Sequence, residues 1–299
     1  MTNSILNTAK SPIYSLEAPS GAVPAGSLCK SDPMTRIAID LDGVIWRGAQ
    51  LISGSDAAVR ALLDAGHEVV FCTNHAQSPA VKLEVLNGFG ISGVAVVTAA
   101  QAAAAFCASG ESVLILGDKS LSEVFREAGI LSLNVDDLPA DGPAPEVDLV
   151  VVGAYTVWDR SRIALAADAI RGGARFVATN DDATFPASST VGPRILPGNG
   201  SLVAAITAAT GVVAEIAGKP HAAMAQVLLD HFGAIDVVVG DKAETDGELA
   251  VRLGAAFALV LSGVTSASDL PVSPTPTYTA QNLSEIVPML LAGGRDLPR

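Results

Sequence analysis

Short apolar runs recur along this chain and are separated by longer amphipathic stretches. Runs of this length, bounded by turn residues, are typical of strands buried in a parallel sheet. They predict strands at residues 37–40, 67–72, 112–116, 149–152, 176–178, 237–239 and 258–261. Strands that alternate with amphipathic segments indicate βαβ units, so the pattern favours an α/β fold built on a parallel sheet.

The stretches between these strands carry helical signals. A helix is predicted over residues 54–65, where Ala58 and Leu62 share one face and Gly66 ends the segment. Further helices are predicted to begin at Ser78-Pro79 and near His221, and to cover residues 94–108 and 283–291. The alternation of strands and helices therefore continues to the end of the organised sequence.

Three segments lack sustained periodicity. Residues 136–146 and 186–200 are rich in proline and polar residues and are predicted to be loops. Residues 1–33 mix Ser, Pro, Gly and Ala and lack the basic start and apolar region of a secretory signal. We interpret them as a poorly ordered extension, with Met34 as the natural start, and expect their deletion to leave folding and activity unchanged.

Two acids follow the first predicted strand. Asp40 and Asp42 can project to the same side of the next loop, and Gly43 allows a tight turn after them. The carboxyl ends of parallel strands are where open α/β sheets place their chemistry, and a pair of acids there suits a metal and proton transfer. The alternative is a strand end with solvated acids.

Three other polar clusters stand at a strand end or a helix start. They are Thr73-Asn74, Gly218-Lys219-Pro220 and the segment Gly240-Asp241 to Asp246. Each has an ordinary alternative: a turn residue, a solvated lysine, and acids favoured by a helix N-terminus. His75 and His221 flank these clusters without an assigned role, and Cys72 is interpreted as a small core residue.

Together these residues provide the parts that phosphoryl transfer needs. Asp40 is the candidate nucleophile and Asp42 the candidate general acid and base. Asp40, Asp241 and the backbone carbonyl of Asp42 are candidate ligands of Mg²⁺, a cation that prefers oxygen. Lys219 and Thr73, with the backbone N–H groups after Asp40, can bind the phosphate. We expect the metal to keep Asp40 ionised while Asp42 carries the proton.

Composition and charge limit the classes of partner that this protein can bind. A formal net charge of −13 argues against nucleic acid or an anionic membrane as the partner. The alanine-rich run at 94–108 is interrupted by Thr98 and Gln101, so it is not predicted to span a membrane. The three cysteines have no metal-binding spacing and are interpreted as reduced thiols in a cytoplasmic protein.

The ordered clusters resemble the four motifs of the haloacid dehalogenase superfamily. More narrowly, residues 174–186, 197–205 and 261–265 resemble its NagD-like branch, which includes 4-nitrophenylphosphatases and phosphoglycolate phosphatases. The resemblance covers residues 35–269. It implies a Rossmann-like core, formed by residues 34–110 and 214–299, with a large α/β cap inserted at 111–213.

The resemblance also implies roles for individual residues. Asn74 would join Thr73 and Lys219 in binding phosphate, and Asp246 would support the metal ligands from behind. The cap would close over the site and select the substrate through a loop that contains Asn180, Asp182 and Phe185. A homodimer through the cap also occurs in the family.

The chain departs from the family pattern at three places. Tyr155 stands where relatives commonly have an acid, Glu244 stands where many have Asp, and the loop at 188–194 is longer than usual. The four motifs are intact, so we expect a Mg²⁺-dependent phosphatase that hydrolyses a small phosphomonoester, such as phosphoglycolate or glycerol phosphate, through an aspartyl-phosphate. The alternatives are a phosphomutase, a dehalogenase and a sensor of phosphorylated metabolites without catalysis.

Overall fold

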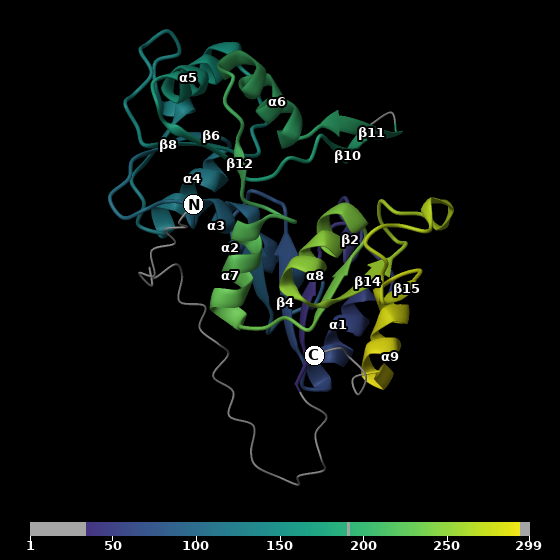
Figure 1. Ribbon diagram of the computed structural model, residues 1–299. Coiled ribbons are helices and arrows are strands. Elements are labelled where there is room, and N and C mark those ends of the chain that lie inside the picture. Colours follow the sequence, from purple (N-terminus) through teal and green to yellow (C-terminus); the bar gives the residue numbers. More distant parts are fainter. Residues whose placement is uncertain (1–33, 190–191, 294–299) are drawn as a thin grey trace, which may run out of the picture.

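A computed structural model describes residues 34–189 and 192–293 of the chain. It consists of two α/β units joined side by side, each built on its own sheet (Figure 1). The predictions for residues 1–33 lie outside the described residues. The α/β fold class predicted from the alternation of strands and helices is confirmed.

The first sheet has six parallel strands, in the order β15-β14-β13-β1-β4-β5. Their bounds are Arg36–Ile39 for β1, Glu68–Thr73 for β4, Ala95–Thr98 for β5, Val237–Gly240 for β13, Ala256–Val260 for β14 and Tyr278–Ala280 for β15. The first strand lies in the middle, with β4 on one side and β13 on the other. The strand order changes direction here, and such a switch point in an open α/β sheet leaves a crevice at the carboxyl ends of the strands.

Helices cover both faces of this sheet. They are α1 (Ser55–Asp64), α2 (Pro79–Gly88), α3 (Ala99–Ala104), α7 (Ala222–Phe232), α8 (Glu248–Leu253) and α9 (Leu283–Gly293). Because side chains alternate along a strand, Ile37 and Ile39 pack with the cluster that contains α1 and α9, whereas Ala38 packs with the one that contains α7 and α8. Burial on both faces explains why these strands are continuous apolar runs.

The second sheet has five parallel strands, in the order β12-β9-β8-β6-β7. Their bounds are Val113–Leu116 for β6, Ser132–Asn134 for β7, Leu149–Val152 for β8, Arg175–Ala178 for β9 and Glu215–Ile216 for β12, and the helices are α4 (Lys119–Glu127), α5 (Arg160–Arg171) and α6 (Asn199–Thr210). We call residues 113–216 the inserted unit. Its last strand, β12, follows residue 213, where the sequence placed the end of the cap.

One apolar cluster crosses between the two units. Leu121, Val124 and Phe125 of α4 belong to the same buried cluster as the alanines of α3, and α3 also contacts α7. Through these contacts, α4 packs the inserted unit against α3 of the first unit. The inserted unit therefore stands at the end of the first sheet where the strands of the crevice finish (Figure 1).

Short elements complete the chain. They are β2 (Trp46–Arg47), β3 (Gln50–Leu51), β10 (Thr184–Ser189), β11 (Gly192–Pro197), the 3₁₀ turns Val135–Asp137 and Ala267–Asp269, and the π-helical turn Ala243–Gly247. None of the helices in the described part of the chain is long and apolar enough to cross a membrane.

Two predictions of local structure were wrong. The segment 94–108 is not one helix, because the β-branched run of β5 precedes α3, and Thr98 caps that helix through its side chain. The segment 186–200 is not a loop: β10 and β11 pair as an antiparallel hairpin that projects from the inserted unit, and α6 begins at Asn199 (Figure 1). Phe185 and Ile195 in this hairpin are exposed, so these two apolar side chains do not form the buried face that marks a strand in the sequence.

Candidate active site

The first two predicted site residues follow β1 at the switch point of the sheet. The backbone N–H of Asp40 donates to the carbonyl of Val239 at 2.9 Å, which continues the pairing of β1 with β13 by one residue. Gly43 has φ +78°, in the left-handed region. A Cβ on Gly43 would lie 2.3 Å from Asp241 Oδ2, and one on Gly263 would lie 1.8 Å from the same atom. Both glycines therefore make room for the Asp241 carboxylate.

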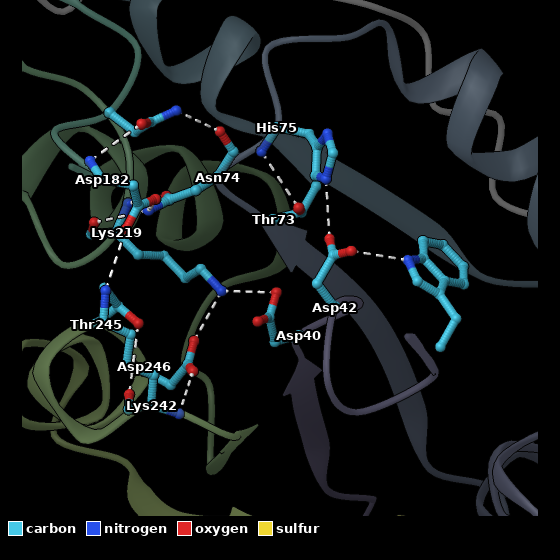
Figure 2. Close-up of polar contacts among 12 residues, drawn as sticks. Asp40, Asp42, Thr73, Asn74, His75, Asp182, Lys219, Lys242, Thr245 and Asp246 are labelled. Carbon is cyan, nitrogen blue, oxygen red and sulfur yellow. Dashed lines mark hydrogen bonds and ion pairs between the residues drawn. The ribbon is translucent and has the colours of Figure 1, made fainter. Parts of the chain in front are cut away.

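Lys219 is the charge at the centre of the site. Its Nζ lies 2.8 Å from Asp40 Oδ1 and 2.7 Å from Asp246 Oδ1, and the residue is only 2 % exposed (Figure 2). Burial alone would lower the pKa of Lys219, but the charges of Asp246 and Asp40 outweigh it and raise the pKa well above its ordinary value. The lysine is therefore a fixed cation at this site.

Asn74 holds Lys219 in place. The Oδ1 of Asn74 accepts from the backbone N–H of Lys219 at 2.7 Å, and its Nδ2 donates to the Lys219 carbonyl at 3.2 Å. The same Nδ2 lies 3.1 Å from Asp182 Oδ2 in the inserted unit. The side chain of Asn74 is thus occupied with protein groups, which makes it a support for Lys219. Its neighbour Thr73 is buried, and Thr73 Oγ1 accepts from the His75 N–H at 3.2 Å.

Three carboxylates gather around this lysine. Ligand oxygens of Asp40, Asp241 and Asp246 all lie within 4.8 Å of one another. Asp241 follows β13, and its Oδ2 accepts from the Val264 N–H at 2.6 Å. The sequence predicted that these acids would meet, and the structure brings them together with Lys219.

The cluster carries more negative than positive charge. Burial raises the pKa of Asp40 well above its ordinary value, with Asp246 and Asp241 adding to the rise and Lys219 opposing it. Burial, followed by the charge of Asp246, raises the pKa of Asp241 to about 6. Three carboxylates beside one ammonium group form a donor set that suits a hard divalent cation.

Asp40 and Asp241 are better placed than Asp246 to bind such a cation. Asp246 already uses Oδ1 on the Lys219 ammonium, at 2.7 Å, and Oδ2 on the Lys242 backbone N–H, at 3.2 Å. It lies on the π-helical turn and is fully buried. Both oxygens of Asp246 thus have protein partners, and its support of the metal ligands stays a prediction.

The Asp42 carboxylate points away from the cluster. Its Oδ2 lies 2.9 Å from His75 Nε2, and its Oδ1 accepts from Trp46 Nε1 at 3.0 Å (Figure 2). Burial raises the pKa of Asp42, but the hydrogen bond and charge of His75, together with Lys82 and Trp46, outweigh it and lower the pKa below its ordinary value. Without a metal, the burial of Asp40 and the partners of Asp42 thus favour a proton on Asp40 over one on Asp42, the reverse of the order expected for the metal-bound site.

The inserted unit reaches this site through the loop after β9. Asn180 Nδ2 donates to the Asn74 carbonyl at 2.8 Å, and Asp182 Oδ1 lies 3.2 Å from Lys242 Nζ. These contacts bring Asn180 and Asp182 to the edge of the site, and their predicted contact with the substrate stays a prediction. Phe185 stands further along at the start of the hairpin, and its side chain is half exposed.

Sequence reasoning missed three contacts. His75 was noted without a role, and neither Trp46 nor Lys242 was singled out. His75 and Lys242 directly follow motif residues in the sequence, so their positions carried a signal. Trp46 lies four residues after Asp42, and the bridge between these two residues is evident only from the structure. Of the departures from the family pattern, Tyr155 is buried within the inserted unit and donates to Asp136 Oδ1 at 2.8 Å.

The arrangement matches known hydrolases. A family model for haloacid dehalogenase-like hydrolases matches residues 37–131, and a HAD-hydrolase-like model matches residues 216–286. The chain is 36 % identical to a D-glycerol 3-phosphate phosphatase of Mycobacterium tuberculosis over 261 residues, which are 83 % of this chain and 69 % of the relative.

Solved structures of phosphatases are similar to this chain as well. A p-nitrophenyl phosphatase from Archaeoglobus fulgidus has a TM-score of 0.75 and 30 % identity, with 86 % of this chain and 99 % of that chain covered. A glycerol phosphate phosphatase from Mycobacterium tuberculosis in complex with magnesium has a TM-score of 0.71 and 35 % identity, with 84 % and 76 % covered.

The chain belongs to the haloacid dehalogenase-like hydrolases. Within this family it is a phosphoric monoester hydrolase, like the relatives that it matches over most of its length. The resemblance to the NagD-like branch, which rested on the motif sequences, is confirmed.

Proposed function

We propose that this protein is a Mg²⁺-dependent phosphatase that hydrolyses a small phosphomonoester through an aspartyl-phosphate at Asp40. The observation that carries the proposal is the group of three carboxylates within 4.8 Å, with Lys219 bound to two of them. Asp40 and Asp241, with the Asp42 carbonyl, would hold the cation. When bound, it would offset the excess negative charge and favour ionised Asp40.

In the first step an Asp40 carboxylate oxygen bonds to phosphorus, and the bond between phosphorus and the leaving oxygen breaks. Asp42 gives its proton to that oxygen, so the product leaves as an alcohol. Lys219 keeps the Asp40 carboxylate oriented and supplies positive charge near the transferring group. Thr73, at the end of β4, and the backbone N–H groups after Asp40 would bind the phosphate oxygens.

In the second step Asp42 takes a proton from water. The water oxygen bonds to phosphorus and the bond from phosphorus to Asp40 breaks, which releases inorganic phosphate and restores both aspartates. Asn74 contributes by fixing the backbone of Lys219 on both sides. Each residue thus returns to its starting state after one turnover.

The inserted unit supports a small substrate. Its loop with Asn180 and Asp182 is hydrogen-bonded to the edge of the site, so it would act as the cap that selects the substrate and excludes water. The relative with the highest identity reported above is named for D-glycerol 3-phosphate. Glycerol phosphate and phosphoglycolate are therefore the first substrates to test, and Phe185 is the cap residue whose contact with substrate stays a prediction.

The test measures phosphate release from a panel of small phosphomonoesters, with Mg²⁺ and with EDTA. Release that depends on Mg²⁺, with isomerised sugar phosphates absent from the products, would support the phosphatase over the phosphomutase. A folded protein that releases no phosphate from any compound would contradict the proposal and favour the sensor. The cytoplasmic location and the homodimer through the cap stay predictions, and size-exclusion chromatography tests the second.

A further inference from the structure

Two ring nitrogens hold the Asp42 carboxylate, one from each side. His75 Nε2 lies 2.9 Å from Oδ2 and Trp46 Nε1 lies 3.0 Å from Oδ1 (Figure 2). These two residues come from different elements: Trp46 belongs to β2, and His75 directly follows Thr73-Asn74 at the end of β4. One carboxylate oxygen is therefore held from within its own loop, by Trp46, and the other is held from the end of β4, by His75.

Trp46 is firmly placed. It is buried, its backbone N–H donates to the Leu41 carbonyl at 3.2 Å, and its carbonyl accepts from the Gly43 N–H at 2.7 Å. Its ring lies 6.1 Å from that of Phe89 in a tilted arrangement. His75 is anchored by its backbone N–H on Thr73 Oγ1, and its side chain is 45 % exposed. The backbone of His75 is thus fixed, while its imidazole ring is partly exposed to solvent.

Asp42 itself needs such support. Its side chain is 48 % exposed, so packing alone does not fix its rotamer. A group that delivers a proton to a leaving oxygen acts only within hydrogen-bond reach of that oxygen, and small misplacements are costly in rate. A carboxylate has about four lone-pair sites, so an oxygen that accepts from His75 or Trp46 keeps room for the transferred proton.

We propose that His75 is a positioning residue for Asp42, with Trp46 as its counterpart on the other oxygen. This inference rests on the proposed phosphatase activity. His75 holds the carboxylate toward the leaving-group oxygen, and it acts through Asp42 without touching the phosphate. Its effect is therefore specific to the part of the reaction in which the leaving group is protonated.

This role predicts a dependence on the leaving group. The alkoxide of an alkyl phosphate leaves poorly without a proton, whereas 4-nitrophenolate is a stable anion and leaves without one. His75→Ala should lower kcat/KM about 10–100-fold for the alkyl phosphate that the wild type hydrolyses best, a part of the usual general-acid contribution. The loss with 4-nitrophenyl phosphate should stay below about threefold, and inhibition by inorganic phosphate should be unchanged.

Three further variants sharpen the test. His75→Gln places an amide N–H where Nε2 stood and should restore most of the alkyl phosphate activity. Trp46→Phe keeps an aromatic ring at this position and removes the Nε1–H donor, so it should show the same selective loss. His231→Ala, on α7 and far from β1 in the sequence, is the matched histidine control and should behave as the wild type. Circular dichroism and the Tm verify that each variant is folded.

The outcomes separate the two proposals. A wild type that releases no phosphate overturns the proposed function, and the role of His75 with it. An active wild type with equal losses for both substrates in His75→Ala, or no loss at all, overturns the role of His75 alone. Loss restricted to the alkyl phosphate, with rescue by glutamine, supports it.

Discussion

Lys219 Nζ lies 2.8 Å from Asp40 Oδ1 and joins the loop after β12 to the end of β1 through two side chains that are nearly buried. The same ammonium group contacts Asp246 at 2.7 Å, so one lysine balances two buried carboxylates. Burial and the remaining negative charge still raise the pKa values of Asp40 and of the third carboxylate, Asp241. In the proposed mechanism, stability, metal binding and reactivity are therefore coupled through a single group of charges.

Replacing the lysine should be costly for the fold. Lys219→Met leaves Asp40 and Asp246 buried without their cation, and removing one partner of a buried ion pair costs about 3–5 kcal/mol. The free energy of unfolding from urea denaturation measures this loss. Lys119→Met, at the start of α4 in the inserted unit, is the control and should change it by less than about 0.5 kcal/mol. Equal stability of the two variants would contradict the prediction.

Removing the nucleophile should separate folding from activity. Asp40→Asn eliminates one of three crowded carboxylates, so the protein should fold with unchanged or higher Tm. Turnover of any phosphomonoester should fall at least about 10³-fold, because an amide cannot form the aspartyl-phosphate. Asp230→Asn on α7 serves as the matched control. Retention of a wild-type kcat by Asp40→Asn would refute the mechanism.

The carboxylate cluster should make the metal-free protein less stable as the pH rises. The pKa of Asp241 is about 6 in the fold against an ordinary 3.8, so between these values the folded protein keeps a proton that the unfolded chain has lost. Raising the pH through this window therefore lowers stability, by about 3 kcal/mol for a shift of this size. Thermal unfolding in EDTA from pH 4 to pH 7 measures the trend.

Mg²⁺ should reverse this trend. Its ligands must be deprotonated, so the rise in Tm on adding Mg²⁺ should be larger at pH 7.5 than at pH 5. Asp241→Asn should raise the Tm of the metal-free protein and remove most of the Mg²⁺ effect. A Mg²⁺ effect of equal size at both pH values, or one that persists in Asp241→Asn, would show that the cation binds elsewhere.

The sequence predicted the parts of the structure that are buried on both faces. The strands β1, β4, β6, β8, β9, β13 and β14 appear as apolar runs because helices cover both sides of each sheet. The hairpin of β10 and β11 carries no such pattern, since Phe185 and Ile195 are exposed. Short edge strands such as β7 and β15 also give too little periodicity to be recognised.

The site was predictable where the chemistry lies next to a strand end. Asp40, Thr73 and Asp241 each stand at the carboxyl end of a strand, and parallel pairing brings those ends together. The contact of Asp42 with His75 and Trp46 depends on where side chains point after β1 and β4, which periodicity does not encode. The link from Asp182 to Lys242 joins the two units and depends on how they pack.

The last prediction concerns the contact between Asp182 and Lys242. Asp182 contacts Lys242 Nζ at 3.2 Å through Oδ1 and Asn74 Nδ2 at 3.1 Å through Oδ2, so one side chain fastens the loop of the inserted unit to the edge of the site. Both partners of the ion pair are about one-third exposed, and screened pairs of this kind contribute up to about 1 kcal/mol. Asp182→Ala should therefore raise KM up to about fivefold for a small phosphomonoester, while Tm changes little.

Asp181→Ala, one residue earlier in the same loop, removes the 3.6 Å contact of Asp181 Oδ2 with His221 Nε2 and shows whether this second link between the units has the same effect. A double-mutant cycle with Lys242→Ala isolates the pair: a coupling energy near zero would mean that Asp182 acts through Asn74 or through the substrate itself.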